Sequence, residues 1–242
     1  MASVGAATQL YVRLAKVCLN TEDGALSVTA YTDREQAIVR KFASGYFWMR
    51  IVRRYFNELF ERNDRRHRPA MKKAAHFFND LATIMIDHFL LLASKVMDPA
   101  ESFGHENLSV YYLVERIIWP ADVANKLSIC VDRMKPFNDH IREARNKILS
   151  HNNLDTILNE EVLGAFPDGM DTDFIAALGE VVELTHRTCV GTPFNPVETF
   201  PGDALDFNKI LREAEALDAY MADHPEQRTE IVAKYILGWN GV

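Results

Sequence analysis

Residues 33–62 read DREQAIVRKFASGYFWMRIVRRYFNELFER and predict one long helix. Apolar side chains recur there every three or four positions, with arginine and lysine between them, which is the spacing of one helix face. These apolar positions are Ala37, Ile38, Phe42, Phe47, Ile51, Tyr55, Leu59 and Phe60. The charged segment that follows ends in Pro69, which lacks an amide donor and disfavours helix at the residue before it. We therefore expect the first helix to end near Arg62 and a second to begin at Pro69.

Helical spacing continues through most of the remaining chain. The further helices that it predicts span about 69–97, 107–119, 121–151, 154–164, 171–190, 203–222 and 226–239. A kink is expected at Pro136, N-caps at Asp171, Thr172 and Asp173, and loops over 101–107 and 191–202. Only 26–31 could form a short strand. The predicted fold class is all-α, a helical bundle with long antiparallel helices and extra C-terminal helices.

Composition places the chain among ordinary globular proteins. Hydrophobic residues make up 48% and charged residues 25% of its 242 positions, so a core can form without disulfides or metals. The three cysteines, Cys18, Cys130 and Cys189, stand apart, which favours a reducing compartment and offers no zinc or redox spacing. The N-terminus lacks the pattern of a signal peptide, and Asp87, His88 and Lys95 interrupt the most apolar stretch. We expect one cytoplasmic domain over 1–242 that does not span a membrane.

The net charge of −7 is distributed unevenly. The stretch from Arg50 to Lys73 carries a net charge of +6, and it includes Arg50, Arg53 and Arg54. A basic stripe on an acidic body fits a phosphate backbone, so these three arginines are predicted to bind RNA. A solvated helix face is an equally good explanation. The nearby aromatic residues Tyr46, Phe47 and Trp48 could stack bases, although aromatic residues at helical spacing usually belong to the core.

The polar end of the predicted helix 121–151 carries the residues most suited to chemistry. It reads NDHIREARNKILSH over 138–151. Arginine can grip a phosphate through two hydrogen bonds, and histidine can move a proton near neutral pH. Together they suit cleavage of RNA through attack by its own 2′-hydroxyl, a reaction that needs no metal and is blind to DNA. Arg145, Asn146 and His151 are the predicted catalytic residues, and Arg142 and Lys147 are predicted to contact RNA.

Spacing alone does not single out this pair, because Arg62 with His67 and Arg133 with His140 have similar spacings. On an ideal helix Arg145 and His151 would also point about 120° apart. They can converge on one phosphate only where the helix ends, or if a second subunit completes the site.

The context of the motif resembles a known superfamily. Asn146 directly after Arg145, with His151 following, resembles the R-N-x-x-x-x-H signature of the HEPN superfamily. Upstream, Asp98-Pro99 at a helix end, a loop and the helix start Asn107-Leu108-Ser109 resemble its abortive-infection AbiU-like branch. The resemblance implies a HEPN-like core over about 33–155 with a helical extension over about 170–240.

The resemblance also implies a function. HEPN proteins are typically dimeric helical bundles, and many are metal-independent ribonucleases of toxin–antitoxin or phage-defence systems. It implies that Arg145 binds the phosphate, that His151 acts as acid or base, and that Asn146 orients substrate or partner residues. The expected partners are RNA, a second copy of the chain and an antitoxin protein, with no cofactor and no metal.

Two alternatives stay open at this point. Arg145 and His151 could simply cap the carbonyls at a helix C-terminus, where cationic side chains are favourable. The chain would then be a non-catalytic helical module that binds nucleotide, RNA or a partner protein. Asp87 and His88, on an otherwise apolar helix, are expected to form a satisfied buried pair rather than to support the site.

Overall fold

The computed structural model describes residues 31–61, 64–144, 146, 166–195 and 203–233. Its long helices are α2 (Asp33–Phe56), α3 (Asp64–Val96), α5 (Ala121–Ala144), α7 (Met170–Thr185) and α8 (Asp203–Asp223). The shorter elements are η1 (Asn57–Glu61), α4 (Val110–Arg116), η3 (His186–Val190), α9 (Pro225–Ile231) and the strands β1 (Glu101–Ser102) and β2 (His105–Glu106). The all-α prediction is confirmed. The expected strand at 26–31, apart from Tyr31, and the helix at 154–164 lie outside the described residues.

The first helix forms as its sequence predicts. Thr32 caps it: the Thr32 hydroxyl accepts a hydrogen bond from the Glu35 amide, and the Glu35 carboxylate accepts one from the Thr32 amide. This reciprocal arrangement satisfies amides that a helix start otherwise leaves unpaired. The buried face of α2 consists of Val39, Phe42, Ala43, Tyr46, Met49 and Val52. Their spacing of three or four residues turns one stripe of α2 to the core.

The start of the second helix was predicted wrongly. Helix α3 begins at Asp64 rather than at Pro69, and its backbone breaks at Ala74, where φ is −155° and ψ is 64°. Pro69 is the sixth residue of α3, and the helix continues past it as far as Ala74. The break therefore lies five residues after the proline that was expected to cause it.

The prediction for 107–119 was right about the start and wrong about the end. Ser109 caps α4 by accepting a hydrogen bond from the Tyr112 amide. The helix ends at Arg116, because the backbone is already extended at Ile117 and the indole of Trp119 folds back to donate to the Leu113 carbonyl. Before α4, the expected loop contains a two-residue hairpin, β1 with β2. Phe103 and Gly104 form its turn, both at positive φ as such tight turns require.

Helix α7 is not capped as predicted. Its N-cap is Gly169, at φ 83°, without a side-chain hydrogen bond, while Asp171, Thr172 and Asp173 lie inside the first turn. The later helices agree better: α8 starts at Asp203 as expected, and α9 starts at Pro225, one residue before the predicted start. Pro136 lies within α5.

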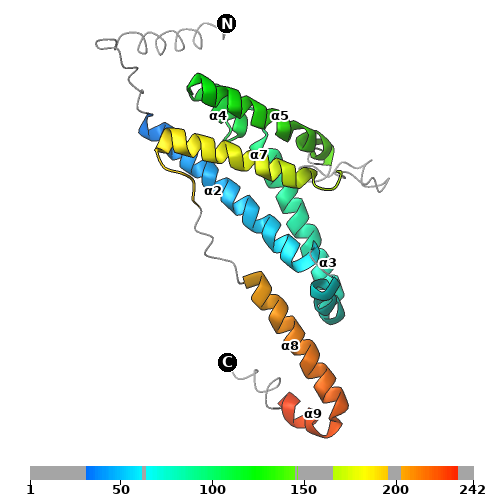
Figure 1. Cartoon of the computed structure of the whole chain (residues 1–242). Helices are drawn as coiled ribbons and strands as arrows, with labels where there is room; N and C mark the ends of the chain where they lie inside the picture. Colours follow the sequence, from blue (N-terminus) through cyan, green and yellow to red (C-terminus); the bar gives the residue numbers. More distant parts are fainter. Residues whose placement is uncertain (1–30, 62–63, 145, 147–165, 196–202, 234–242) are drawn as a thin grey trace, which may run out of the picture.

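One core is shared by α2, α3, α4, α5 and α7. At its centre, the ring of Phe137 on α5 lies 4.9 Å from that of Phe174 on α7 and 6.3 Å from that of Phe89 on α3. Figure 1 shows α7 beside α5 and crossing α2, with α8 extending away from them. Helix α7 thus belongs to the packed core, although the sequence placed it in a C-terminal extension. The division into a core and an extension stays a prediction.

Helix α8 packs against η1 and α3. The Asn208 amide donates to the Glu58 carbonyl at 2.9 Å, and the ring of Phe207 lies 6.0 Å from that of Phe78. Several apolar side chains of α8 stay exposed, including Ile210 and Leu217.

Among the described residues, one stretch is long and apolar enough to cross a membrane by length and composition. It is Ala74–Val96, with 23 residues and a mean hydropathy of 1.3. Core helices of soluble proteins have the same properties, and this stretch supplies Phe89, Leu90 and Ala93 to the core. That the chain does not span a membrane stays a prediction.

Candidate nucleic-acid interface

The predicted catalytic motif begins where the described part of α5 ends. Helix α5 runs to Ala144, and Asn146 is exposed just beyond it. Arg145, Lys147 and His151 lie outside the described residues, so their mutual geometry stays a prediction. The same holds for the meeting of two motifs across a dimer.

Arg142 lies in the last turn of α5 and is exposed. It lines a pocket of about 420 Å³ together with Lys135, Asn138 and Asp139 of the same helix. The facing wall comes from the end of α3 and from α4, including Ser94 and Tyr111. A hydrogen bond to Asp132 and its negative charge raise the pKa of Lys135, which therefore stays cationic. This polar pocket adjoins the end of α5, and besides its two cations it is lined by the carboxyl groups of Asp98, Glu115 and Asp139.

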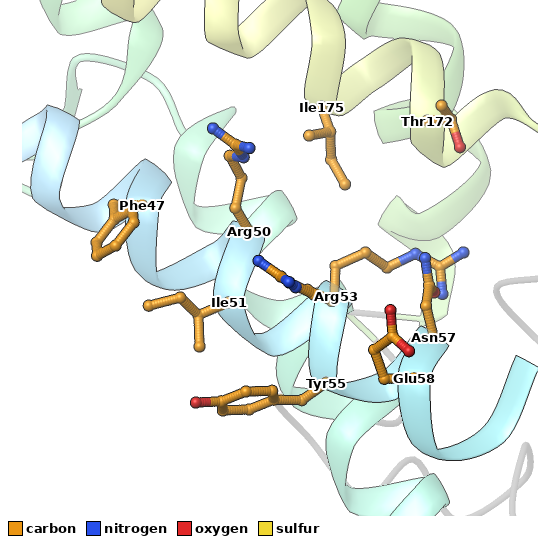
Figure 2. Close-up of a pocket in the computed structure, with 10 residues that line it drawn as sticks. Phe47, Arg50, Ile51, Arg53, Tyr55, Asn57, Glu58, Thr172 and Ile175 are labelled. Atoms are coloured by element: carbon orange, nitrogen blue, oxygen red, sulfur yellow. The ribbon is translucent and has the colours of Figure 1, made fainter. Parts of the chain in front are cut away.

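Three predicted RNA-binding residues come together on α2. Arg50, Arg53 and Arg54 line one pocket of about 530 Å³ between α2, η1 and α7. Figure 2 shows Arg50 and Arg53 extending from α2 toward α7, from which Ile175 and Thr172 face them. Phe47, Ile51 and Tyr55 line the same pocket along α2. The arrangement combines guanidinium groups with aromatic and aliphatic surface, which suits a nucleotide.

The three arginines have different surroundings. Arg53 forms a 2.5 Å ion pair with Asp171, in which the side chains are only 17% and 4% exposed, and its guanidinium lies over the rings of Phe56 and Phe89. These contacts give Arg53 a structural role between α2 and α7, and its contact with RNA stays a prediction. The guanidinium of Arg50 lies 5.7 Å from the centroid of the Tyr46 ring.

The pocket on α2 and the end of α5 face the same end of the bundle. Helix α7 links them, since Asp171 in its first turn pairs with Arg53 on α2, and Phe174 one turn later contacts Phe137 on α5. Figure 1 shows the end of α5, the start of α7 and the lower half of α2 on one side of the molecule. The side chains of 61–73, which hold the rest of the basic stripe, are not described.

The other residues that the sequence analysis considered for the site differ in how far they are buried. Tyr46 is buried, whereas Trp48 is 49% exposed. Asp87 and His88 are both exposed, so the expected buried pair is wrong. His88 instead accepts a hydrogen bond from the Trp48 indole at 3.3 Å, and partial burial raises the pKa of Asp87. A helix with only one buried face leaves room for such a polar pair on its outer side.

Comparison with known protein families gives one match. The family model of the AbiU2 HEPN proteins matches residues 36–210, which is more than half of the chain. The chain belongs to the AbiU2 family. No curated protein and no solved structure matches it significantly. The match runs from α2 into α8, so it includes both the α2 pocket and the motif of the AbiU2 chain.

Sequence reasoning missed three features of this interface. Asp171 was expected to cap α7, and Thr172 and Ile175 were not expected to face the arginines of α2. Only the tertiary crossing of α7 over α2 brings them there. Among the described residues, no cluster of three or more His, Cys, Asp or Glu side chains could hold a metal ion.

Proposed function

We propose that this AbiU2 protein is a metal-independent endoribonuclease of a toxin–antitoxin or phage-defence type. Membership of the family carries the proposal, because HEPN domains are generally associated with ribonuclease activity. The R-N-x-x-x-x-H motif from Arg145 to His151 supports it, and so does the arginine-lined pocket, which lies on the same side of the bundle as the end of α5. The proposed substrate is RNA, and the proposed site of action is the cytoplasm.

The proposed reaction uses the substrate's own nucleophile. A base removes the proton of the ribose 2′-hydroxyl, whose oxygen attacks the adjacent phosphorus, and the bond from phosphorus to the 5′-oxygen breaks. An acid protonates that leaving oxygen, which yields a 2′,3′-cyclic phosphate and a 5′-hydroxyl. His151 serves one of the two proton transfers, and Arg145 offsets the charge that grows on the phosphate. Asn146 orients the substrate or a partner residue.

A homodimer completes the proposed site. On an ideal helix the side chains of Arg145 and His151 diverge by about 120°. Two copies of the motif meeting across an interface would supply a guanidinium and an imidazole to the same phosphate. An antitoxin protein is the further proposed partner. The alternative is a non-catalytic helical module, in which the same region binds nucleotide, RNA or a protein without cleavage.

The test is cleavage of total RNA by the purified full-length protein in the presence of EDTA. The wild type should produce fragments with 2′,3′-cyclic phosphate ends, and the variants Arg145→Ala and His151→Ala should leave the RNA intact. Matched controls are Arg34→Ala and His105→Ala, because both residues lie near the hairpin, away from the proposed site. An inactive wild type would favour the non-catalytic alternative, and motif variants that cleave as well as the controls would exclude Arg145 and His151 from the reaction.

A further inference from the structure

We propose that the pocket between α2 and α7 binds one unpaired nucleotide of single-stranded RNA, with its phosphate on Arg50 and Arg54 and its base against Tyr55. The proposal rests on the proposed function for RNA as the natural ligand. It does not rest on cleavage, because none of these residues belongs to the catalytic motif. The positive charge of the arginines predicts contact with the RNA backbone, and the new element is a subsite for a base beside them.

The cations of the pocket are placed for a phosphate. Arg50 and Arg54 are four residues apart on α2, so they lie one above the other on the same face of the helix. Figure 2 shows Arg50 extending from α2 toward α7, and its guanidinium lies 5.7 Å from the centroid of the Tyr46 ring. Guanidinium groups bind phosphate oxygens through paired hydrogen bonds and keep their charge at any physiological pH.

Arg53 has a different task in this pocket. Its ion pair with the buried carboxylate of Asp171 ties α2 to the first turn of α7. The pair fixes the two walls relative to each other, so the positions of Arg50 and Arg54 are set before a ligand arrives. A preorganised site loses less conformational entropy on binding.

The remaining surface of the pocket fits a base rather than a bare phosphate. Phe47, Ile51 and Tyr55 line it along α2, and Ile175 lines it from α7. These side chains are partly exposed, so their apolar surface is available. Every base has a flat face that stacks on an aromatic ring, and such stacking tolerates any sequence. The volume of about 530 Å³ lies within the range of small-ligand sites.

The lining of the pocket predicts a preference between single-stranded and duplex RNA. A base in a duplex is stacked on its neighbours and cannot lie against Tyr55 unless it leaves the stack. The pocket should therefore prefer single-stranded RNA to duplex RNA. Glu58 also lines the pocket, and its carboxylate disfavours a second phosphate beside it.

The experiment measures binding with the full-length His151→Ala protein, which separates binding from cleavage. The probes are a fluorescent adenosine 12-mer RNA, a blunt 12-bp RNA duplex and free AMP, each titrated at several salt concentrations. The variants Arg54→Gln and Tyr55→Leu are added to this background. Matched controls are Arg34→Gln, which removes an exposed arginine, and Phe103→Leu, which removes a fully exposed aromatic ring in the hairpin.

The two variants should differ in a way that a merely structural role would not produce. Arg54→Gln should weaken binding of the single strand by about tenfold and lower the slope of log affinity against log salt by about 1. Tyr55→Leu should weaken it by about fivefold or more at an unchanged salt slope, because stacking releases no counterions. The RNA duplex should bind more weakly than the single strand, and Tyr55→Leu should not change its affinity. Weak saturable binding of free AMP would show that the pocket itself holds a nucleotide.

A crosslinking measurement needs no pocket variant. RNA that contains 4-thiouridine, irradiated with the His151→Ala protein, should attach to a peptide that includes residues 47–55. Crosslinks that map elsewhere, or variants that bind single-stranded RNA as tightly as the two controls, would overturn the proposal. If the wild type does not cleave RNA but the variants show the expected binding pattern, the ribonuclease proposal is wrong and the pocket proposal stands. If the wild type cleaves RNA but Arg54→Gln and Tyr55→Leu bind single-stranded RNA as tightly as the controls, the pocket proposal is wrong and the ribonuclease proposal stands.

Discussion

The guanidinium of Arg53 on α2 lies 2.5 Å from a carboxylate oxygen of Asp171 on α7. Both side chains are almost closed to solvent, and the carboxylate oxygen accepts no hydrogen bond of good geometry, so the contact is chiefly electrostatic. It joins two helices that are more than a hundred positions apart in the sequence. The wall of the arginine-lined pocket therefore depends on a charge pair between α2 and α7.

Asp171→Asn should destabilise the protein by roughly 2–4 kcal/mol, because it keeps the shape of the side chain but leaves the Arg53 charge unpaired in a desolvated place. Unfolding by urea, followed by circular dichroism, measures the loss. The control is Asp168→Asn, an exposed position in the turn before α7, which should change the stability by less than about 0.5 kcal/mol. Equal stability of the two variants would show that the ion pair contributes nothing net.

Two glycines inside helices should respond to alanine with opposite signs. A Cβ at Gly179 on α7 would lie 2.5 Å from the hydroxyl oxygen of Tyr46, whereas a Cβ at Gly45 on α2 would meet nothing within 4 Å. Gly45→Ala should stabilise the protein by about 0.5–1 kcal/mol through helix propensity. Gly179→Ala should destabilise it by about 1–2 kcal/mol, because overpacking against buried Tyr46 outweighs the same propensity gain.

The pair of glycine variants is checked by thermal or urea unfolding of both in parallel. Adding Tyr46→Phe to Gly179→Ala removes the closest clashing atom, so the cost of the alanine should fall when it is measured on the Tyr46→Phe background. If alanine at 179 proved as favourable as alanine at 45, α7 and α2 would not approach each other as closely as described.

The helices of this bundle were predictable because their signal is local. The face of α2 from Val39 to Val52 repeats at helical spacing, and Thr32 with Glu35 forms a capping box within four residues. The same local reasoning failed at two helix boundaries. Trp119 ends α4 early by reaching back to the Leu113 carbonyl, and Pro69 does not interrupt α3.

The candidate site was predictable in its residue types and less so in its geometry. A cluster of positive charge pointed to Arg50, Arg53 and Arg54, which do line one pocket. Charge counting could not distinguish Arg53, which is paired with Asp171, from Arg50 and Arg54. Asp171 lies far along the chain, and its local sequence is that of a helix cap. Such a partner is set by the crossing of two helices, and the spacing within either one carries no information about it.

Alkaline pH should weaken the fold through two thiols. Burial raises the pKa of Cys130 to about 11, with a further contribution from the charge of Glu180, and burial also raises that of Cys189 to about 11. The ordinary pKa of a cysteine is 9.0, so between pH 9 and 11 the folded state holds protons that the unfolded state releases. Stability should therefore fall as pH rises, by about 1 kcal/mol per thiol between pH 8 and 10.

Urea unfolding at pH 8 and pH 10 checks the effect of the thiols. The double variant Cys130→Ala with Cys189→Ala should lose most of this pH dependence while being less stable than the wild type at pH 8, because it leaves small cavities. An unchanged difference between the two pH values in the double variant would assign the alkaline effect to other groups. The thiols of Cys130 and Cys189 should also resist alkylation at pH 8, since only a small fraction of each is ionised.

Arg142 should act in capturing RNA rather than in the chemical step. It is exposed on α5, one turn before Asn146, and lines the pocket that includes the cationic Lys135. Arg142→Gln should raise KM for a short RNA substrate by about tenfold, leave kcat within about twofold and lower the salt slope by about 1. Arg133→Gln is the control on the same helix, because Glu180 already pairs with Arg133 at 2.7 Å. A fall in kcat at constant KM would show that Arg142 stabilises the transition state. If Arg142→Gln and Arg133→Gln behaved alike, the effect of Arg142 would be explained by net charge alone.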